Sequence, residues 1–113
     1  MDIEKIQHAI RHIFEEITPP NARIGDLEYQ WVFDTERHHY QLLVTGWEQT
    51  RRIHSIVVQI DLRDGLVWVQ EDNTDYGVVE ELERQGIPKN KIVLGWQSSF
   101  MRKHSGYATG DAA

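Results

Sequence analysis

Four strand-like runs separated by very short connections constrain the fold of this chain more than any other feature. The runs are residues 27–33, 40–47, 52–62 and 66–70. The first alternates apolar and polar side chains, and the others are rich in β-branched and aromatic residues. The connections hold only a few residues, and the last contains Asp64-Gly65, which is typical of a tight hairpin turn. Because no crossover helix fits between neighbouring strands, the pattern predicts an antiparallel meander.

Two helical patterns flank the predicted meander. Apolar residues at three- and four-residue steps predict an amphipathic helix over residues 2–17, capped by Asp2 and ended by two prolines. A second helix is predicted over about residues 75–85. Thr74 is its expected N-cap, and Gly86 lies just beyond its last turn.

The length of 113 residues corresponds to one domain. Residues 92–94 form a short apolar run, which fits either a last strand or a packed extended segment. The predicted fold class is α+β, with a single domain over residues 1–113. It consists of an antiparallel sheet of about four to five strands with two helices packed on one face. The small and polar residues from about 108 to 113 predict a frayed C-terminal tail.

Charge and composition exclude several classes of function. The 12 Lys and Arg residues and 18 Asp and Glu residues give a net charge of −6, which disfavours sequence-independent DNA binding. The absence of cysteine excludes a disulfide framework, a cysteine nucleophile and an iron–sulfur site. The chain has no apolar run of membrane-helix length and no secretory signal in its first residues. A soluble cytoplasmic protein without membrane contact is expected.

The densest polar cluster lies in the connection between the first two predicted strands. It contains Asp34, Glu36, Arg37, His38 and His39. Carboxylates near imidazoles bind divalent metals or carry out general acid–base catalysis. Because side chains alternate in direction along strands, there are two alternatives. The loop is either stabilised by its own hydrogen bonds or serves as a contact surface.

Histidines on the first predicted helix offer a second metal hypothesis. His8 and His12 are four residues apart, which is a metal-ligand spacing, and Glu15 or Glu16 supplies a further ligand. Both histidines point away from the isoleucines of this helix, so they also fit a solvated helix face.

The tryptophans divide into two groups. Trp31 and Trp68 lie in apolar strand patterns and are expected in the core. Trp47 and Trp96 stand beside glycines at the ends of segments. Partly exposed aromatic side chains are enriched at protein interfaces, so Trp47 and Trp96 are candidate interface residues.

Basic residues near two segment ends are the candidate phosphate contacts. They are Arg51, Arg52, Arg102 and Lys103. If the third strand and the C-terminal segment lie close together, these side chains form one basic spot that contacts phosphate. The alternative is that they pair with the many acidic residues of the chain.

From Phe33 onward the sequence resembles the XisI-like proteins. The matching residues are Phe33-Asp34-Thr35-Glu36-Arg37-His38-His39-Tyr40-Gln41-Leu42-Leu43, Gly46-Trp47, Arg51-Arg52, Asp61, Gly65, Trp68, Gln70, Asn73-Thr74, Glu81-Leu82, Gly86-Ile87-Pro88-Lys89 and Ile92-Val93-Leu94-Gly95. They keep family-like spacing over nearly the whole chain. Residues 98–103 depart from the family, whose members often carry a Pro-Pro-Tyr-Lys-Arg type sequence there.

The resemblance implies a regulatory protein with an XisI-like α+β fold. The family is cyanobacterial and is named after a controlling factor for excision of the fdxN element, a DNA rearrangement of heterocyst differentiation. Excision itself is assigned to a separate recombinase, and a companion protein, XisH, acts with the family. The expected function is therefore that of a non-enzymatic accessory protein without a cofactor. It is expected to contact an XisH-like partner and to form a homo-oligomer.

Other functions stay open at this point. One is a DNA-binding accessory factor that uses the four basic residues named above. Another is a small metal-dependent enzyme built on the cluster at residues 34–39. The acidic balance also fits contact with a basic nucleic-acid-processing partner through charge complementarity.

Overall fold

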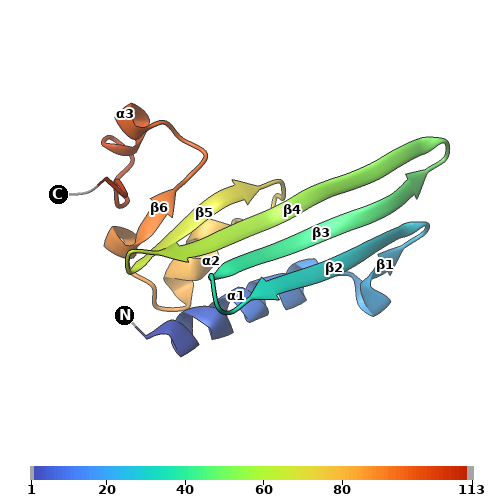
Figure 1. Ribbon diagram of the computed structural model, residues 1–113, viewed down its shortest axis with the longest axis horizontal. Coiled ribbons are helices and arrows are strands. Elements are labelled where there is room, and N and C mark those ends of the chain that lie inside the picture. Colours follow the sequence, from blue (N-terminus) through green and yellow to red (C-terminus); the bar gives the residue numbers. More distant parts are fainter. Residues whose placement is uncertain (1, 112–113) are drawn as a thin grey trace.

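The structure, a computed structural model that describes residues 2–111, contains one six-stranded sheet with helices packed against it (Figure 1). In chain order the elements are α1 (Ile3–Ile17), the 3₁₀ turn η1 (Pro20–Ala22), β1 (Arg23–Ile24), β2 (Leu27–Asp34), β3 (His39–Glu48), β4 (Arg51–Arg63), β5 (Leu66–Asp72), α2 (Val78–Arg84), the 3₁₀ turn η2 (Lys89–Lys91), β6 (Ile92–Leu94) and α3 (Ser99–Arg102). The strands follow one another across the sheet in the order β1 to β6. The predicted α+β class is confirmed.

The first five strands form the predicted antiparallel meander, whereas β6 pairs with β5 in parallel. The sheet is therefore mixed and has six strands, which corrects the expectation of four to five antiparallel ones. The chain between β5 and β6 carries α2, and this connection is the crossover that parallel neighbours need. β1 and α3, with two and four residues, are too short to give a periodic pattern.

The start of α2 differs from the sequence prediction. Its N-cap is Gly77, which has the left-handed conformation with φ 84° and no side chain to cap the helix. The amide of Val78 at the start of the helix donates to the Asp72 carboxylate at 3.4 Å instead. Thr74, the predicted cap, instead stabilises the preceding loop. Its hydroxyl donates to Asp72 at 2.6 Å and accepts from the amide of Tyr76 at 3.2 Å. The left-handed Gly77 separates this loop from α2, so the helix begins after residue 77 and not after Thr74.

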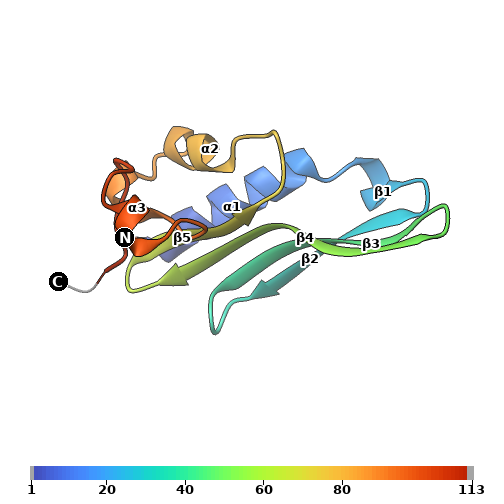
Figure 2. The same cartoon turned by 90° about the horizontal axis from the view of Figure 1, so that it is seen from above.

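Both of the longer helices, α1 and α2, cover the same face of the sheet (Figure 2). The buried core between them and the sheet consists of Ile6, Ala9, Ile10, Ile13, Phe14, Tyr40, Leu42, Val58, Ile60, Val67, Val69, Val78, Val79, Leu82, Ile87, Ile92 and Leu94. At the start of α1, the Asp2 side chain accepts a hydrogen bond from the Glu4 amide, which confirms the predicted cap. Within residues 2–111, no helix has the length and apolar character needed to cross a membrane.

Trp68 is buried on the other face of the sheet, with only 6% of its surface exposed. Its neighbours Val67 and Val69 point into the helix-covered core, so the alternation of the strand turns Trp68 the opposite way. The guanidinium groups of Arg63 and Arg102 lie 4.1 and 5.3 Å from its ring centroid. The indole is therefore buried, as predicted, but beneath the C-terminal segment and not beneath the helices.

The C-terminal segment returns along β6, the last strand of the sheet. The Ala108 amide donates to the carbonyl of Ile92 at 2.9 Å, and the Asp111 carboxylate accepts from the Ser99 hydroxyl at 3.0 Å. Ala108 and Asp111, which the sequence placed in a frayed tail, are therefore bonded to the fold. The last two residues of the predicted tail, 112 and 113, lie outside the described residues.

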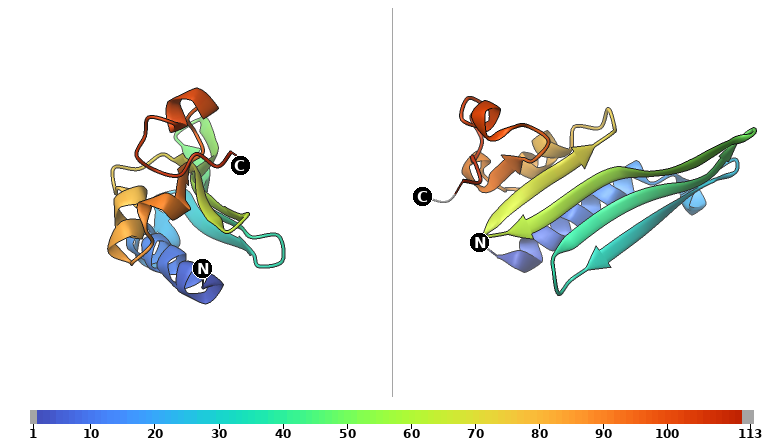
Figure 3. Two further views of the ribbon diagram at one scale, coloured as in Figure 1. Left: turned by 90° about the vertical axis from the view of Figure 1, so that its left-hand side faces the viewer. Right: turned by 45° about the horizontal axis from the view of Figure 1, so that its top comes forward.

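At its other end the sheet extends past the helices (Figures 1 and 3). We define this hairpin arm as β1, the β3–β4 turn and the adjoining strand ends, residues 23–28 and 44–54. Two of its apolar side chains are strongly exposed, Ile24 by 56% and Trp47 by 48%. The arm lengthens the molecule, which measures 48 × 29 × 25 Å along its principal axes.

Candidate interaction surfaces

The predicted polar cluster at residues 34–39 begins with a turn that Asp34 closes. Its carboxylate accepts hydrogen bonds from the backbone amides of Glu36 at 3.0 Å and Arg37 at 2.9 Å. The bond from the Arg37 amide is the main reason that the pKa of Asp34 lies below its usual value. The side chains of Glu36 and Arg37 are exposed. Asp34 therefore has a structural role in the turn.

The two histidines of this cluster point to opposite faces of the sheet. The Nδ1 atom of His38 lies 3.0 Å from the hydroxyl of Tyr40, a core residue. The Nδ1 atom of His39 lies 2.9 Å from the carboxylate of Asp61, on the face that α1 and α2 leave uncovered. The structure therefore does not gather the carboxylates and imidazoles of residues 34–39 around one point.

Asp61 is the centre of a polar network on the sheet face that α1 and α2 leave uncovered. Besides its contact with His39, its carboxylate accepts hydrogen bonds from the amides of Gln59 and Gln70, each at 3.1 Å. Gln41 in turn donates to Gln59 at 2.8 Å. Sequence reasoning missed this network because it depends on the strand register, which places His39 opposite Asp61 and Gln41 opposite Gln59. The network places side-chain amides and the half-exposed imidazole of His39 on this face of the sheet.

The two tryptophans predicted at an interface are exposed, at opposite ends of the molecule. Trp47 lies in the hairpin arm and Trp96 follows β6, which is at the far end of the sheet from the β3–β4 turn (Figure 1). Their exposed fractions are 48% and 52%. In the arm, the Arg52 guanidinium lies 5.4 Å from the ring centroid of Trp47. The two indoles therefore belong to two separate surfaces.

The four predicted phosphate contacts do not form one basic spot. Arg51 and Arg52 lie beside the β3–β4 turn, whereas Arg102 and Lys103 lie in and just after α3, at the other end of the sheet (Figure 1). The Arg102 side chain is only 13% exposed and pairs with Asp111 at 3.3 Å. Arg51, Arg52 and Lys103 are exposed, and Arg51 pairs with Glu48 at 3.1 Å. Arg102 stabilises the fold through its pair with Asp111.

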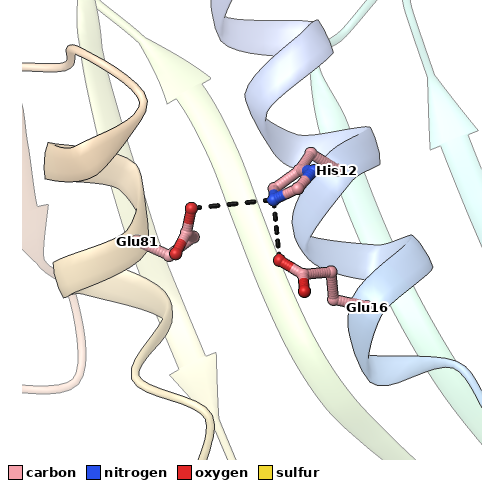
Figure 4. A group of neighbouring side chains, drawn as sticks. All are labelled: His12, Glu16 and Glu81. Atoms are coloured by element: carbon pink, nitrogen blue, oxygen red, sulfur yellow. Dashed lines mark ion pairs between the residues drawn. The ribbon is translucent and has the colours of Figure 1, made fainter.

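A further polar group joins the two longer helices (Figure 4). The Nε2 atom of His12 lies 2.7 Å from Glu16 and 3.7 Å from Glu81 on α2. Glu81 also accepts hydrogen bonds from Gln85 at 3.0 Å and Arg84 at 2.8 Å, and these bonds lower the pKa of its carboxyl group.

Within residues 2–111 these three side chains are the one set with metal-ligand geometry, their ligand atoms lying within 4.8 Å of one another. The guanidinium of Arg84 already pairs with the Glu81 carboxylate, and its positive charge would repel a metal ion bound at the same carboxylate. The arrangement functions best as a polar bridge between α1 and α2. The other predicted ligand on α1, His8, is exposed to solvent.

Two tyrosines donate hydrogen bonds to carboxylates in the helical layer. The Tyr76 hydroxyl donates to Glu16 at 2.6 Å, and the Tyr107 hydroxyl donates to Glu83 at 2.8 Å. Burial, followed by these hydrogen bonds, raises the pKa of both phenols above the usual value, that of Tyr107 to about 12.

The ultraviolet absorbance of the Tyr107 phenol is expected to show a late step at alkaline pH, above the usual range of tyrosine. Tyr107 stays protonated in the folded chain where an unfolded tyrosine ionises, at about pH 10. Its contribution to stability is therefore present below about pH 10 and lost as the pH rises to about 12. In Tyr107→Phe the late absorbance step should shrink, and the free energy of unfolding should depend less on pH in this range. Ionisation of all tyrosines together near pH 10 would contradict this assignment.

Comparisons with known proteins place these surfaces in a family context. The sequence model of a family described as XisI protein matches residues 1–109. A crystal structure described as a XisI-like protein from Anabaena variabilis is 34% identical, with a TM-score of 0.87, and the alignment covers 95% of this chain and 98% of that one. A second, described as fdxN element excision controlling factor XisI from Anabaena variabilis, is 25% identical, with a TM-score of 0.78 and coverages of 94% and 99%. A search of curated proteins gave no significant match.

Proposed function

The chain belongs to the XisI protein family, and on that basis we propose that it is a non-enzymatic regulatory protein in the control of DNA element excision. It acts through contacts with a protein partner that resembles XisH. The observation that carries this proposal is the similarity over 94% of the chain to a protein described as the fdxN element excision controlling factor XisI.

The surfaces of the chain support a role in binding a protein. The sheet face without α1 and α2 presents the Asp61 network, and the exposed indoles of Trp47 and Trp96 offer large amphipathic contacts. The metal-dependent enzyme built on residues 34–39 has weaker support, because His38 and His39 point to opposite faces.

Self-association is part of the proposal. Neither α1 nor α2 covers the hairpin arm (Figure 1). Ile24 and Trp47 expose about half of their surface there. A second copy of the chain that packs against the arm would remove this apolar surface from water.

A direct DNA contact is the second candidate function. It is favoured by the position of Arg51 and Arg52 at the end of the arm, where the Arg51 side chain is 75% exposed. The net charge of −6 disfavours it.

Affinity capture from the native host, with and without nuclease, is expected to recover an XisH-like protein in stoichiometric amount in both cases. Trp47→Ala and Trp96→Ala should each be tested for reduced recovery, because truncation of an interface tryptophan commonly costs more than about 1 kcal/mol of binding. Phe100→Ala is the control, on an exposed aromatic side chain that neither candidate function uses. The DNA-binding function would instead be favoured by two results together. Partners would be recovered only while nucleic acid is intact, and the double variant Arg51→Ala/Arg52→Ala would no longer recover them.

A further inference from the structure

The negative charge of the chain is concentrated in one short segment. Residues 71–83 contain six Asp and Glu residues and no Lys, Arg or His. The other twelve of the 18 acidic residues are balanced by the 12 Lys and Arg residues elsewhere. The net charge of −6 therefore originates at the end of β5, the loop that follows it, and α2.

This segment borders a groove beside Trp96. The groove consists of two neighbouring hollows of about 340 and 410 Å³, and both are lined by Asp72 and Trp96. We define the acidic groove by its chemically important lining residues, which are Glu71, Asp72, Asp75, Glu80, Trp96 and Tyr107. A carboxylate-lined hollow with aromatic walls matches a side chain that is both cationic and flat.

Most carboxylates of the groove have no cationic partner within residues 2–111. Glu71, Asp75 and Glu80 are exposed, and no Lys, Arg or His nitrogen of the described residues lies within 4.0 Å of them. Glu83, in contrast, pairs with Lys89 at 4.0 Å. The charge of the groove is therefore available to a positively charged partner.

Trp96 differs from the other two tryptophans that lie near arginines. Trp47 has the guanidinium of Arg52 over its ring, and Trp68 has those of Arg63 and Arg102. Within the described part of the chain no Lys or Arg lies over Trp96, although 52% of its surface is exposed beside carboxylates. The same pairing of indole and guanidinium can be completed there only from outside the chain.

We propose that the acidic groove binds an arginine-containing segment of the protein partner. A guanidinium stacks on the face of Trp96 and donates hydrogen bonds to the carboxylates of Asp75 and Glu80. Arginine suits this site better than lysine because its planar group combines stacking with bidentate contacts to carboxylates. The proposal rests on the proposed function, since it names the chemistry by which that function's partner is recognised.

The first test measures the binding of fluorescein-labelled hexa-arginine to the whole protein by anisotropy. Asp75→Asn/Glu80→Gln should weaken binding roughly tenfold, since it removes two exposed ion pairs. The control double variant Glu4→Gln/Glu15→Gln changes the net charge equally, at exposed carboxylates outside the groove that make no ion pair within residues 2–111. It should weaken binding less than about twofold. Equal losses in the two double variants would overturn the proposal.

The second test concerns the indole. Trp96→Ala should weaken hexa-arginine binding roughly fivefold, whereas Trp47→Ala should leave it unchanged. Hexa-lysine should bind more weakly than hexa-arginine to the unmodified protein. Equal affinity for the two peptides, or no effect of Trp96→Ala, would overturn the assignment to arginine. Displacement of the peptide by Mg²⁺ at constant ionic strength would assign the groove to a metal ion instead.

Affinity capture separates this proposal from the proposed function. Asp75→Asn/Glu80→Gln should lose the protein partner that the unmodified chain recovers. Equal recovery by both would overturn the groove as the binding site and leave the regulatory function intact. Peptide binding at the groove without any recovered protein partner would contradict the regulatory function and not the chemistry of the groove.

Discussion

Replacing Phe14 by alanine is expected to lower the free energy of unfolding by about 3–5 kcal/mol. Phe14 is fully buried, and its ring centroid lies 5.9 Å from that of Trp31 and 5.5 Å from that of Phe33, both in edge-to-face geometry. The truncation leaves a cavity between α1 and β2 and removes two aromatic contacts. Because small domains are commonly stable by only about 5–15 kcal/mol, urea denaturation should show a large shift of the midpoint.

Phe100→Ala is the matched control for this prediction. Phe100 lies on α3 with 68% of its surface exposed, so its truncation should change the free energy of unfolding by less than about 0.5 kcal/mol. Similar losses of stability in the two variants would show that α1 is not packed on the sheet through Phe14. The slope of the denaturation curve should be unchanged in both variants if the unfolded state exposes the same surface.

Local patterns in the sequence were sufficient to predict the meander and both longer helices. Each predicted strand is present with its ends within two residues, because period-two alternation and short turns report directly on antiparallel neighbours. The cap of α1 was also predictable, since the Asp2 side chain bonds to an amide only two residues away. Interactions close in sequence are the ones that a single sequence reveals.

The parts of the fold that were not predicted depend on contacts distant in sequence. The parallel pairing of β6 requires the crossover through α2, and three apolar residues carry no signal for parallel or antiparallel pairing. The start of α2 was predicted three residues too early, because Thr74 belongs to a loop bonded to Asp72 and the left-handed Gly77 separates that loop from the helix. Both cases show a tertiary or loop interaction overriding a correct local preference.

The candidate surfaces were predicted residue by residue but not as groups. Exposure of Trp47 and Trp96 follows from their positions beside glycines, whereas their separation to opposite ends of the sheet depends on the whole topology. The partnership of His39 with Asp61 depends on the β3–β4 register across 22 residues of sequence. The residues 34–39, which are adjacent in sequence, are therefore separated in space. The polar group that the structure does assemble is the Asp61 network, whose members come from β3, β4 and β5.

The two ends of the molecule have different chemistry, which bears on how a regulator engages its partners. The arm exposes the apolar side chains of Ile24 and Trp47 and contains as many Arg as Asp and Glu residues, whereas the acidic groove lies in the segment that carries the net charge. The proposed self-association through the arm and the proposed partner binding at the groove would therefore use separate surfaces. The integrity of the arm can be tested through the backbone at its base.

Gly46 lies at the base of the arm in a conformation that other residues rarely adopt. Its φ is +145°, and it stands opposite Leu27 in the pairing of β3 with β2. A Cβ atom added here would collide with the backbone carbonyl of Asp26. The same carbonyl accepts a hydrogen bond from the Trp47 amide at 3.3 Å, so it is held in place. Only glycine lets the two chain segments approach this closely.

Gly46→Ala is therefore expected to lower the free energy of unfolding by about 3 kcal/mol, from backbone strain together with overpacking against the Asp26 carbonyl. Urea denaturation measures the loss, and amide hydrogen exchange should locate it in β1 and the adjoining ends of β2 and β3. Gly25→Ala is the matched control in the same arm. Gly25 also has a positive φ, of +57°, but no atom lies within 4 Å of an added Cβ, so its cost should stay near about 1 kcal/mol. Equal costs at the two positions would mean that the arm relaxes around the new methyl group, and Gly46 would then not be required for the close approach of β2 and β3.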